Sequence, residues 1–487
     1  MTLNEVPILI GCAARELGAT VVTRVTEDSR KCVPGSVFVA APGEHVDGHD
    51  FVSFAVSAGA IAVIGERNGI SQSAGVPYLN VRNARKALGI LVHTLHGNPS
   101  QQMPVIGITG TNGKTTSARM VQHILRSSGH PCAFFGTIGY DIAGEMHEAK
   151  HTTPFGEELA DMLAQARDAG ETHVAMEVSS HALEQERVAG IRFRVGAFTN
   201  LTQDHLDYHK DMESYKRAKL MLFERIEGDD AFTAVNKEDP NAAAFVAASR
   251  VKCYSYGPGG EVRAERANTT ARETTFGMKS PWGNASVKMR MLGKHNVANA
   301  LCAATICGGL GVPVETIAQA LGTLQNVPGR FEHVDAGQSF QVIVDYAHTD
   351  DGLRNVLNAA RGICDGRLIV VFGCGGDRDK TKRPKMGAVA AQLGDFAIVT
   401  SDNPRSEDPE RILLDIEVGL QHAGNQKYDD YEMILDRTEA IRRAIGMAKA
   451  GDVIMIAGKG HEDYQILGSK RIHFDDREVA RAILSES

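Results

Sequence analysis

Paired cysteines, long hydrophobic runs and an excess of basic charge are all absent from this 487-residue sequence. The eight cysteines are scattered, and no two of them form a CxxC pair. That usage is typical of reduced thiols in a cytosolic enzyme and argues against a disulfide framework or a zinc site. Residues 1–5 lack the basic start and apolar run of a secretory signal peptide, so we expect a cytoplasmic protein.

The longest uncharged stretch, residues 296–314, contains two Asn, three Gly and one Pro. It suits a buried helix followed by a turn better than a membrane span, and we expect no insertion into a membrane. The chain has 52 Lys and Arg against 60 Asp and Glu, a formal net charge of −8. A mildly acidic chain is a poor general nucleic-acid binder, so we expect no nucleic-acid partner.

Hydrophobic residues make up 43% of the chain and charged residues 23%, the proportions of an average soluble globular protein. At roughly 150 residues per domain, the length predicts about three domains. Turn-forming clusters at residues 96–100 and 327–330 divide the chain. The predicted domains are residues 1–100, 101–330 and 331–487.

Short buried strands alternate with helices along the chain, which predicts the α/β class. The first domain is expected to have strands at 37–41 and 60–64 and helices at 51–58 and 83–96. Strands at 105–109, 173–178, 195–200 and 231–236 predict a largely parallel sheet in the central domain. The third domain is expected to be Rossmann-like, with strands at 340–345, 368–372, 396–400 and 453–457 and helices at 353–360, 385–393, 409–419 and 438–449.

A glycine-rich loop follows the strand at 105–109 and opens a helix that runs to about residue 128. Such a turn forms an anion cradle, because backbone N–H groups and the positive end of the helix dipole face the phosphates. We expect Lys114 to contact phosphate and the Thr115 hydroxyl to bind Mg²⁺. Ile108 replaces the first glycine of the strict phosphate-loop pattern, and the alternative is a strand–helix turn with an exposed lysine. The predicted ATP-binding loop consists of Gly110, Thr111, Asn112, Gly113, Lys114, Thr115 and Thr116.

Polar clusters follow two further strands, with Glu177 in the first and His205 in the second. Beside a phosphate loop, such residues can hold Mg²⁺, which prefers oxygen ligands and phosphate bridges. The alternatives are a helix-capping role for Glu177 and a surface-loop position for His205.

Eight motifs in this order resemble those of the Mur ligase family and cover essentially the whole chain. They are TGTNGKTT (109–116), EVSSH (177–181), TNLTQDHLDYH (199–209), GKHNVAN (293–299), DYAHT (345–349), GCGGDRD (373–379), DNPR (402–405) and GKGHE (458–462). The resemblance implies a small α/β N-terminal domain for the UDP-linked substrate, a central ATP-binding domain and a C-terminal domain for the amino acid. It also implies an ATP-dependent amide ligase of peptidoglycan precursor synthesis.

Within the family, the motifs are closest to the class that adds the third amino acid. The implied reaction joins meso-2,6-diaminopimelate to UDP-N-acetylmuramoyl-L-alanyl-D-glutamate through an acyl phosphate. The implied partners are therefore small molecules, with ATP and Mg²⁺ as cofactors, and we expect a monomer.

The resemblance also implies binding residues for the UDP-linked substrate and for ATP. Asn296 is expected at adenine, Arg330 at the phosphates and Asp345 at the ribose. The alternatives are helix capping for Asn296 and a surface salt bridge for Arg330. His151 stands where relatives have asparagine. Implied contacts to the UDP-linked substrate are Ser29, Glu44, His45, Val46, His151, Thr152, Thr153, Ser179, Gln185 and Arg187.

Lys219 matches a lysine that the family carries as a carbamate. With His205 it is expected to hold a second Mg²⁺, while Thr115 and Glu177 hold the first. Lys114, Glu177, His205 and Lys219 are the expected catalytic residues. By itself, a lysine with two basic neighbours on a helix indicates a solvated face.

Arg405, just after the predicted strand at 396–400, can grip a carboxylate with two hydrogen bonds. The distal carboxylate of meso-diaminopimelate requires such a partner, whereas L-lysine has no such carboxylate. Glu462 is expected to meet the distal ammonium. The implied set of diaminopimelate contacts is Arg378, Asp402, Asn403, Pro404, Arg405, Gly458 and Glu462.

Four alternatives remain: an L-lysine-adding ligase, a folylpolyglutamate- or cyanophycin-type ligase, a nucleotide-gated regulator and a dinucleotide-dependent dehydrogenase. The Asp28-Ser29-Arg30 and DNPR segments argue against the second. A regulator would not need Glu177, His205 and Lys219 together. No GxGxxG opens the third domain, which argues against a dehydrogenase.

Overall fold

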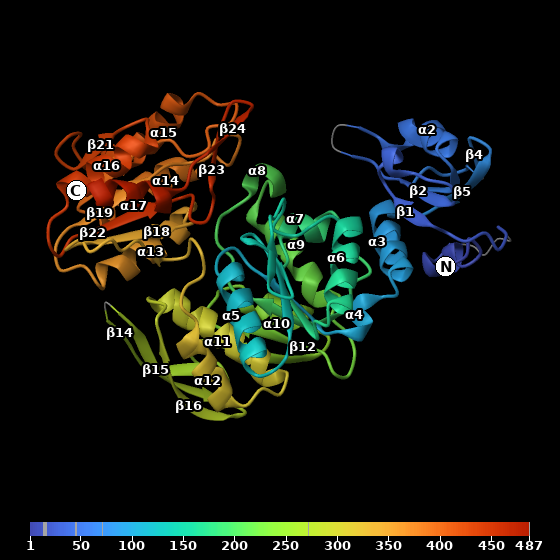
Figure 1. Ribbon diagram of the computed structural model, residues 1–487, viewed down its shortest axis with the longest axis horizontal. Helices are drawn as coiled ribbons and strands as arrows, with labels where there is room; N and C mark the ends of the chain where they lie inside the picture. The colour runs from blue at the N-terminus through green and yellow to red at the C-terminus, as the bar shows by residue number, and fades with distance from the viewer. Residues whose placement is uncertain (13–16, 44–45, 71, 271, 487) are drawn as a thin grey trace.

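The computed structural model describes residues 1–487 except 13–16, 44–45, 71, 271 and 487. It is an α/β protein, as the alternation of strands and helices predicts. Three parts follow one another along the chain, from the N-terminal part on the right of Figure 1 to the C-terminal part on its left. The exact domain boundaries stay a prediction.

The N-terminal part is built on a five-stranded sheet that is parallel except for one edge strand. Its helices include α1 (Val6–Leu9), α2 (Val52–Ser57) and α3 (Ala84–Leu95). Helix α3 also packs against α6 of the central part and so joins the two. In sheet order, the strands are β1 (Arg24–Thr26), β2 (Ser36–Ala40), β3 (Ala60–Gly65), β5 (Val76–Asn80) and β4 (Gln72–Ser73).

The central part contains an eight-stranded sheet with β6 between β11 and β10. Its strands pair in parallel as far as β7, and β8 and β9 are added by antiparallel pairing. This order places the phosphate loop after β6 beside the carboxyl ends of both neighbours. In sheet order, the strands are β13 (Lys252–Tyr256), β12 (Phe232–Asn236), β11 (Phe193–Phe198), β6 (Val105–Thr109), β10 (His173–Glu177), β7 (Cys132–Gly136), β8 (Gly139–Ile142) and β9 (Glu145–His147). The helices are α4 (Pro99–Gln102), α5 (Lys114–Ser127), α6 (Gly156–Asp168), α7 (Ser180–Glu184), α8 (Leu206–His209), α9 (Met212–Glu224), α10 (Ala242–Ala248), α11 (Lys294–Gly309) and α12 (Val314–Thr323).

A three-stranded antiparallel sheet extends the central part and was not expected from the sequence. It consists of β14 (Arg263–Thr269), β15 (Thr274–Ser280) and β16 (Gly283–Met289). Alternate residues such as Phe276, Met278, Val287 and Met289 are buried, and the residues between them are more exposed. One face therefore joins the core beneath α12, as the two-residue period of a strand allows.

The C-terminal part has a six-stranded sheet that is parallel except for the short strand β17. In sheet order, the strands are β17 (Glu332–His333), β18 (Gln341–Asp345), β22 (Val453–Ala457), β19 (Leu368–Phe372), β20 (Phe396–Val399) and β21 (Tyr431–Met433). A separate hairpin pairs β23 (Tyr464–Leu467) with β24 (Lys470–His473). The helices are α13 (Asp350–Arg361), α14 (Lys382–Leu393), α15 (Pro409–His422), α16 (Arg437–Met447) and α17 (Asp476–Glu486).

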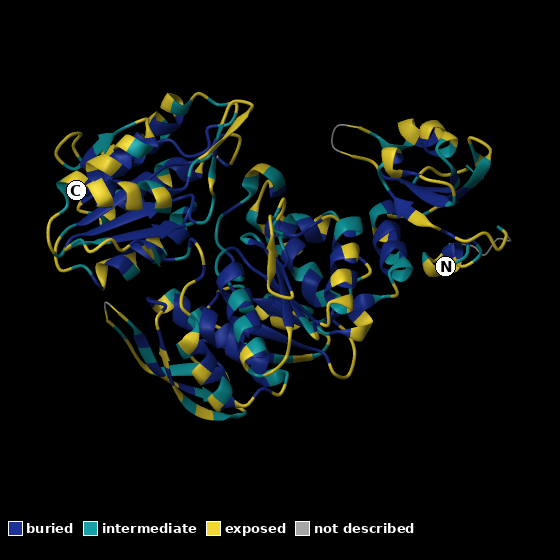
Figure 2. Ribbon diagram, in the orientation of Figure 1, coloured by how far each residue is buried: buried dark blue, intermediate teal, exposed yellow. Residues whose placement is uncertain are grey.

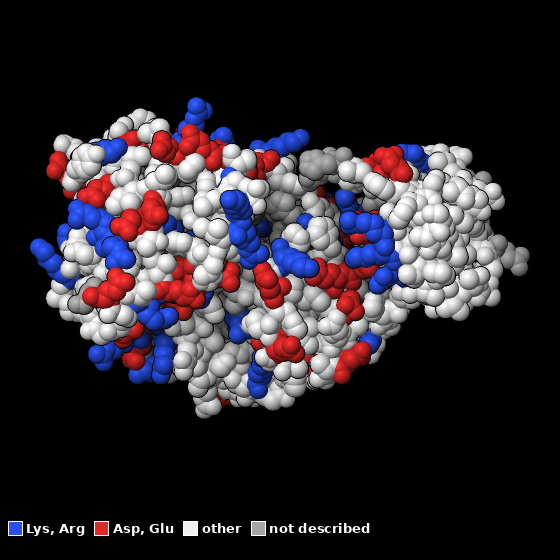
Figure 3. All heavy atoms as spheres, turned by 45° about the horizontal axis from the view of Figure 1, so that its top comes forward, with Lys and Arg blue, Asp and Glu red and all other residues white. Residues whose placement is uncertain are grey.

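Burial follows these layers, with dark sheet strands between helices that have one buried and one exposed side (Figure 2). Basic and acidic side chains are interspersed on the face shown in Figure 3. Within the described ranges, no helix is both long enough and apolar enough to cross a membrane.

His93 on α3 is fully buried, and neither ring nitrogen has a hydrogen-bond partner. Loss of solvation lowers its pKa from 6.5 to about 4, so the folded protein holds a neutral ring where the unfolded chain takes up a proton. Stability is therefore lost as the pH falls from about 6.5 towards 4, by at most about 3 kcal/mol from this group.

We expect His93→Leu to remove the part of the stability loss at acid pH that His93 causes. The measurement is the thermal unfolding midpoint of both proteins at pH 5 and pH 7.5. His422→Gln, an exposed histidine at the end of α15, is the matched control. An equal drop in midpoint for the wild type and His93→Leu would contradict the prediction.

Candidate functional site

The loop of residues 110–113 joins β6 to α5 and needs glycine at two positions. Gly110 has a φ of +149° and Gly113 a φ of +84°. A Cβ on Gly110 would collide with Thr199 Oγ1, and a Cβ on Gly113 with Asn299 Oδ1. Ile108, which replaces the first glycine of the usual pattern, is a fully buried strand residue. The loop therefore forms without that glycine, because β6 continues to Thr109.

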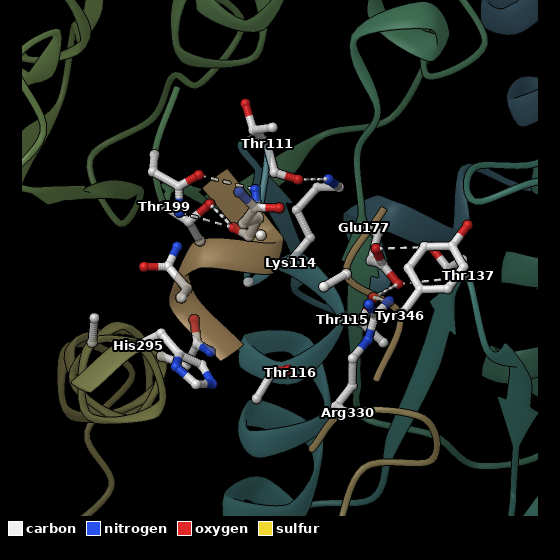
Figure 4. Close-up of a pocket in the computed structure, with 18 of the residues that line it drawn as sticks. Thr111, Lys114, Thr115, Thr116, Thr137, Glu177, Thr199, His295, Arg330 and Tyr346 are labelled. Carbon is white, nitrogen blue, oxygen red and sulfur yellow. Dashed lines mark hydrogen bonds between the residues drawn. The ribbon is translucent and has the colours of Figure 1, made fainter. Parts of the chain in front are cut away.

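Lys114 folds back over the loop. Its Nζ donates to the backbone oxygen of Gly110 at 2.9 Å and to that of Thr111 at 2.8 Å (Figure 4). The ammonium lies among backbone carbonyls, and loss of solvation lowers its pKa. The alternative of an exposed lysine on a plain turn is wrong.

Glu177 ends β10 beside the loop and is almost fully buried. Its Oε1 accepts from Thr115 Oγ1 at 2.9 Å and from the Thr137 backbone at 2.7 Å. Arg330 Nη2 donates to the same Thr115 hydroxyl at 3.0 Å, as Figure 4 shows. Ser179 caps α7, so the helix-cap alternative for Glu177 is wrong. Among the described residues, Arg330 has no carboxylate within ion-pair distance, so its salt-bridge alternative has no support.

His205 stands beside the buried carboxylate of Asp204, with Nε2 3.3 Å from Oδ2. Loss of solvation lowers the pKa of His205 to about 3, which leaves a neutral ring able to act as a ligand. Burial raises the pKa of Asp204, but three interactions outweigh it and bring that pKa well below its usual value. They are the charge of His205 in its protonated form, the hydrogen bond from His348 and the charge of Lys382. His348 Nε2 lies 3.6 Å and Lys382 Nζ 4.0 Å from this carboxylate. His205, Asp204, His348 and Lys382 therefore form one polar cluster, the His205 cluster. Asp204 and Lys382 are buried in it, whereas the His205 side chain is 37% exposed.

Lys219 on α9 is 1% exposed, so the solvated face indicated by its basic neighbours is wrong at this position. Its Nζ donates to the Gly110 backbone oxygen at 2.9 Å and lies 4.3 Å from the centre of the Tyr215 ring. Loss of solvation, and then the charge of Lys114, bring the pKa of Lys219 well below its usual value.

The residues expected at the nucleoside are buried and already hydrogen-bonded. Asn296 Nδ2 donates to the Leu292 oxygen at 2.8 Å, and Asn299 donates to Asn296 Oδ1 at 3.1 Å. Asp345 accepts the backbone N–H groups of Phe331 and Ala347, both at 2.7 Å, and thereby holds the chain beside Arg330. Burial raises the pKa of Asp345.

Asn296, Asn299, Arg330 and Asp345 line a first cavity, which extends from the phosphate loop to α11 and α13. A second cavity of about 580 Å³ lies between the central and C-terminal parts. Both cavities are lined by Thr137, Thr152, Asp204, His205, Tyr346 and His348. The two cavities therefore meet at the His205 cluster.

The second cavity gathers most of the residues expected to bind the amino acid. Arg378, Asp402, Asn403, Arg405, Gly458 and Glu462 line it, whereas Pro404 is not part of its lining. Arg405 Nη1 donates only to backbone oxygens, those of Gly376 at 2.8 Å and Asn403 at 3.4 Å. In the part of the chain that the structure describes, neither Arg378 nor Arg405 has a carboxylate within ion-pair distance. Both guanidinium groups are available to an acidic ligand.

The residues expected to bind the UDP-linked substrate are only partly brought together. His151 and Thr152 line the second cavity, and Thr152 and Ser179 line the first. Thr153, Gln185 and Arg187 form an adjoining network, with Arg187 Nη1 donating to the Thr153 oxygen at 3.1 Å. Ser29 and Val46 lie in the N-terminal part, and Glu44 and His45 lie outside the described residues.

Several polar residues of the cavities were not singled out from the sequence. Thr137 holds Glu177, Tyr346 packs under Arg330 with 4.5 Å between guanidinium and ring centre, and Lys382 faces Asp204. Lys459 lies within the GKGHE motif but is buried behind the second cavity. A motif names such residues without revealing which of them face the cavity.

No group of three or more His, Cys, Asp or Glu side chains gathers at a metal-binding distance within the described residues. Mg²⁺ usually takes only one or two protein oxygens, together with substrate phosphate and water. Thr115 and Glu177 offer two such oxygens beside the phosphate loop.

Contacts between the central and C-terminal parts surround the cavities. Asn112 of the phosphate loop donates to Asp351 Oδ2 at 2.8 Å, and Gln203 donates to Thr381 Oγ1 at 2.8 Å. The C-terminal part thus closes both cavities from one side.

Comparison with known proteins agrees with this geometry. Residues 21–96 match the profile "Mur ligase family, catalytic domain", 108–307 the "Mur ligase middle domain" and 329–460 the "Mur ligase, glutamate ligase domain". Two similar curated proteins are named UDP-N-acetylmuramoyl-L-alanyl-D-glutamate–2,6-diaminopimelate ligase. That of Bacillus licheniformis is 45% identical over 95% of each chain, and that of Gloeobacter violaceus 43% identical over 100% of this chain and 98% of its own.

A solved structure of a ligase with the same name superposes with a TM-score of 0.67. It is 31% identical and covers 95% of this chain and 94% of its own. Full-length similarity at this level, together with three family profiles in order, shows that the chain belongs to the Mur ligase family.

Proposed function

We propose that this protein is an ATP-dependent ligase that adds meso-2,6-diaminopimelate to UDP-N-acetylmuramoyl-L-alanyl-D-glutamate in peptidoglycan precursor synthesis. One observation carries the proposal: the cavity beside the phosphate loop meets a second cavity, whose two arginines, Arg378 and Arg405, have no carboxylate partner among the described residues. ATP in the first and an acidic amino acid in the second would approach one another at the His205 cluster.

The chemistry requires activation, because a carboxylate does not react with an amine unaided. The γ-phosphoryl group of ATP passes to the D-glutamate carboxylate, which releases ADP and forms an acyl phosphate. The amine of diaminopimelate attacks the acyl carbon, a C–N bond forms, phosphate leaves, and the nitrogen loses a proton. Such reactions depend mostly on positioning and on stabilisation of charge.

Lys114 and the loop residues Gly110, Thr111, Asn112, Gly113, Thr115 and Thr116 would bind the phosphates of ATP. Asn296, Arg330 and Asp345 would complete the nucleotide site. Mg²⁺ would be held by Thr115 and Glu177, and a second ion by His205 and carbamylated Lys219, where it neutralises phosphate charge. His205 is neutral in this surrounding, as a metal-binding imidazole must be.

The three parts would divide the work. Residues 1–100 would bind the uridine end of the substrate, 101–330 ATP, and 331–487 the amino acid. Ser29 and Val46 lie in the first of these, whereas the other described contacts lie beside the cavities. Those other contacts are His151, Thr152, Thr153, Ser179, Gln185 and Arg187.

The first test is phosphate release by the purified protein with ATP, Mg²⁺ and the UDP-linked dipeptide, with meso-diaminopimelate or L-lysine in parallel. Release and tripeptide formation only with diaminopimelate would support the proposal. Turnover with lysine would still show that the protein is an ATP-dependent ligase, but it would overturn the role of Arg405 in binding the distal carboxylate. No turnover with either amino acid would overturn the proposed function.

Arg405→Met is expected to raise the KM for diaminopimelate by about 100-fold, because a bidentate charged contact is lost. The KM for ATP should change little, since Arg405 lines only the second cavity. The comparison variant Arg411→Met removes an exposed arginine of α15. A rise in the KM for ATP equal to that for diaminopimelate would contradict the prediction.

A further inference from the structure

We propose that Lys459 is a positioning residue, which holds Asp402, Asn403 and Glu462 in the arrangement that receives the distal ammonium of the incoming amino acid. The inference rests on the proposed function and deepens it. Lys459 follows β22 and is fully buried, but it is not part of the lining of either cavity. It therefore acts through its neighbours and not by touching substrate.

The ammonium of Lys459 has one acceptor for each of its three protons. Nζ lies 3.4 Å from Asp402 Oδ1, 3.2 Å from Asn403 Oδ1 and 3.2 Å from Glu462 Oε2. A buried lysine is stable only when its charge is paired and its donors are used. Here all three partners line the second cavity, so the pairing that satisfies Lys459 also fixes their side chains.

The three partners are also tied to one another. Asn403 Nδ2 donates to Glu462 Oε2 at 2.9 Å, and the Ile466 backbone donates to Asn403 Oδ1 at 3.0 Å. Gly458 allows the close approach, because a Cβ there would lie 2.9 Å from Asp402 Oδ2. Lys459 sits at the centre of this network. Its loss would remove the donor of Asp402 Oδ1 and one of the two donors of Asn403 Oδ1 and of Glu462 Oε2.

The charges explain why a cation is needed behind the cavity. The pKa of Glu462 is raised by burial and then by the charge of Asp402. Burial also raises the pKa of Asp402, but the charges of Lys459 and Arg437 outweigh it, so that the pKa of Asp402 is lowered. Arg437 is itself neutralised by Asp476 at 2.7 Å, and Arg405 contributes less. With Lys459 present, two carboxylates and one ammonium leave a net charge of −1, which suits one ammonium of the substrate. Without it, the charge of Asp402 would raise the pKa of Glu462 unopposed by Lys459.

The test measures kinetics of Lys459→Met and of Lys459→Gln, which keeps two hydrogen-bond donors without the charge. We expect the KM for diaminopimelate to rise by about 10- to 100-fold, as for the loss of a charged hydrogen bond. The KM for ATP should stay near that of Lys470→Met, an exposed lysine on β24 that serves as the control. The thermal midpoint should fall below that of the control, because two buried carboxylates lose their cationic partner. If Lys459→Met does not fold, the same expectation applies to Lys459→Gln.

A double-mutant cycle separates positioning from a general structural role. If Lys459 acts through Glu462, Lys459→Met in the Glu462→Gln background should raise the KM for diaminopimelate no more than about twofold further. The inference would be overturned if the double variant raised the KM for diaminopimelate by the product of the two single-variant factors. An equal rise in the KM for ATP would overturn it as well. An unchanged KM in both Lys459 variants would also overturn it while the proposed function stands. Absence of diaminopimelate turnover by the wild type would instead overturn the proposed function, and this inference with it.

Discussion

Lys114→Met is expected to lower kcat by about 10³-fold or more. In the structure, its ammonium lies within hydrogen-bond distance of the carbonyls of Gly110 and Thr111, at the N-terminus of α5. Phosphate oxygens placed on the loop would meet this ammonium in a site shielded from water, where a charge stabilises transferred phosphoryl groups far more than in solution. No other lysine begins α5, so the methionine variant would lack this ammonium and keep only Arg330 as a cationic side chain expected at the phosphates.

The measurement is steady-state phosphate release at saturating ATP, dipeptide and amino acid. Lys294→Met provides a close control, because Lys294 also begins a helix beside the first cavity but is exposed. The control should retain activity within about twofold, as exposed surface substitutions usually do. A Lys114→Met protein with near-normal kcat would show that the loop does not hold the reacting phosphate.

Many of the buried strands were predictable, because they appear in the sequence as short apolar runs. Their order in each sheet was not predicted. The strands at 105–109, 368–372 and 453–457 have the bounds that their apolar runs predict. Helix α13 starts at Asp350 and not at 353, because the Thr349 side chain accepts the Gly352 N–H at 3.0 Å and caps it earlier.

The sheet of β14, β15 and β16 could not be predicted in the same way. Strand β14 has the sequence RAERANT, and none of its residues is fully buried. It becomes a strand by pairing with β15, whose own alternation of buried and exposed residues is the only local signal.

At the site, the motifs predicted which residues lie close together, but not how deeply each of them is buried. The phosphate loop, Glu177 and His205 come together because β6, β10 and β11 are neighbours in a parallel sheet. The burial of Lys219 and Lys459 was not predictable, since it arises from segments distant in sequence, such as the Gly110 carbonyl and Asp402. A local pattern of charges therefore misassigned Lys219 to a solvated face.

The same burial leads to the second large effect: Lys219→Met and Lys219→Arg should each lower kcat by about 10³-fold. Because its pKa lies well below the usual value, more of Lys219 is in the neutral amine form, which is the form that attacks CO₂. In the proposed carbamylation, an N–C bond would form and the nitrogen would lose a proton to water, which would give a carbamate anion with two oxygens. Methionine has no amine, and the guanidinium of arginine stays protonated and cannot attack.

Equal losses in the two variants are the decisive feature, because a role as a simple cation would be retained by arginine. Lys216→Met is the matched control on the same helix, where Lys216 pairs with Glu213 at the surface. The wild type should also lose activity in CO₂-free buffer and regain it when bicarbonate is added, whereas the Lys219 variants should not respond. Near-normal kcat in Lys219→Arg, or wild-type activity indifferent to CO₂, would show that the lysine acts as an ammonium, held between the Gly110 carbonyl and the Tyr215 ring.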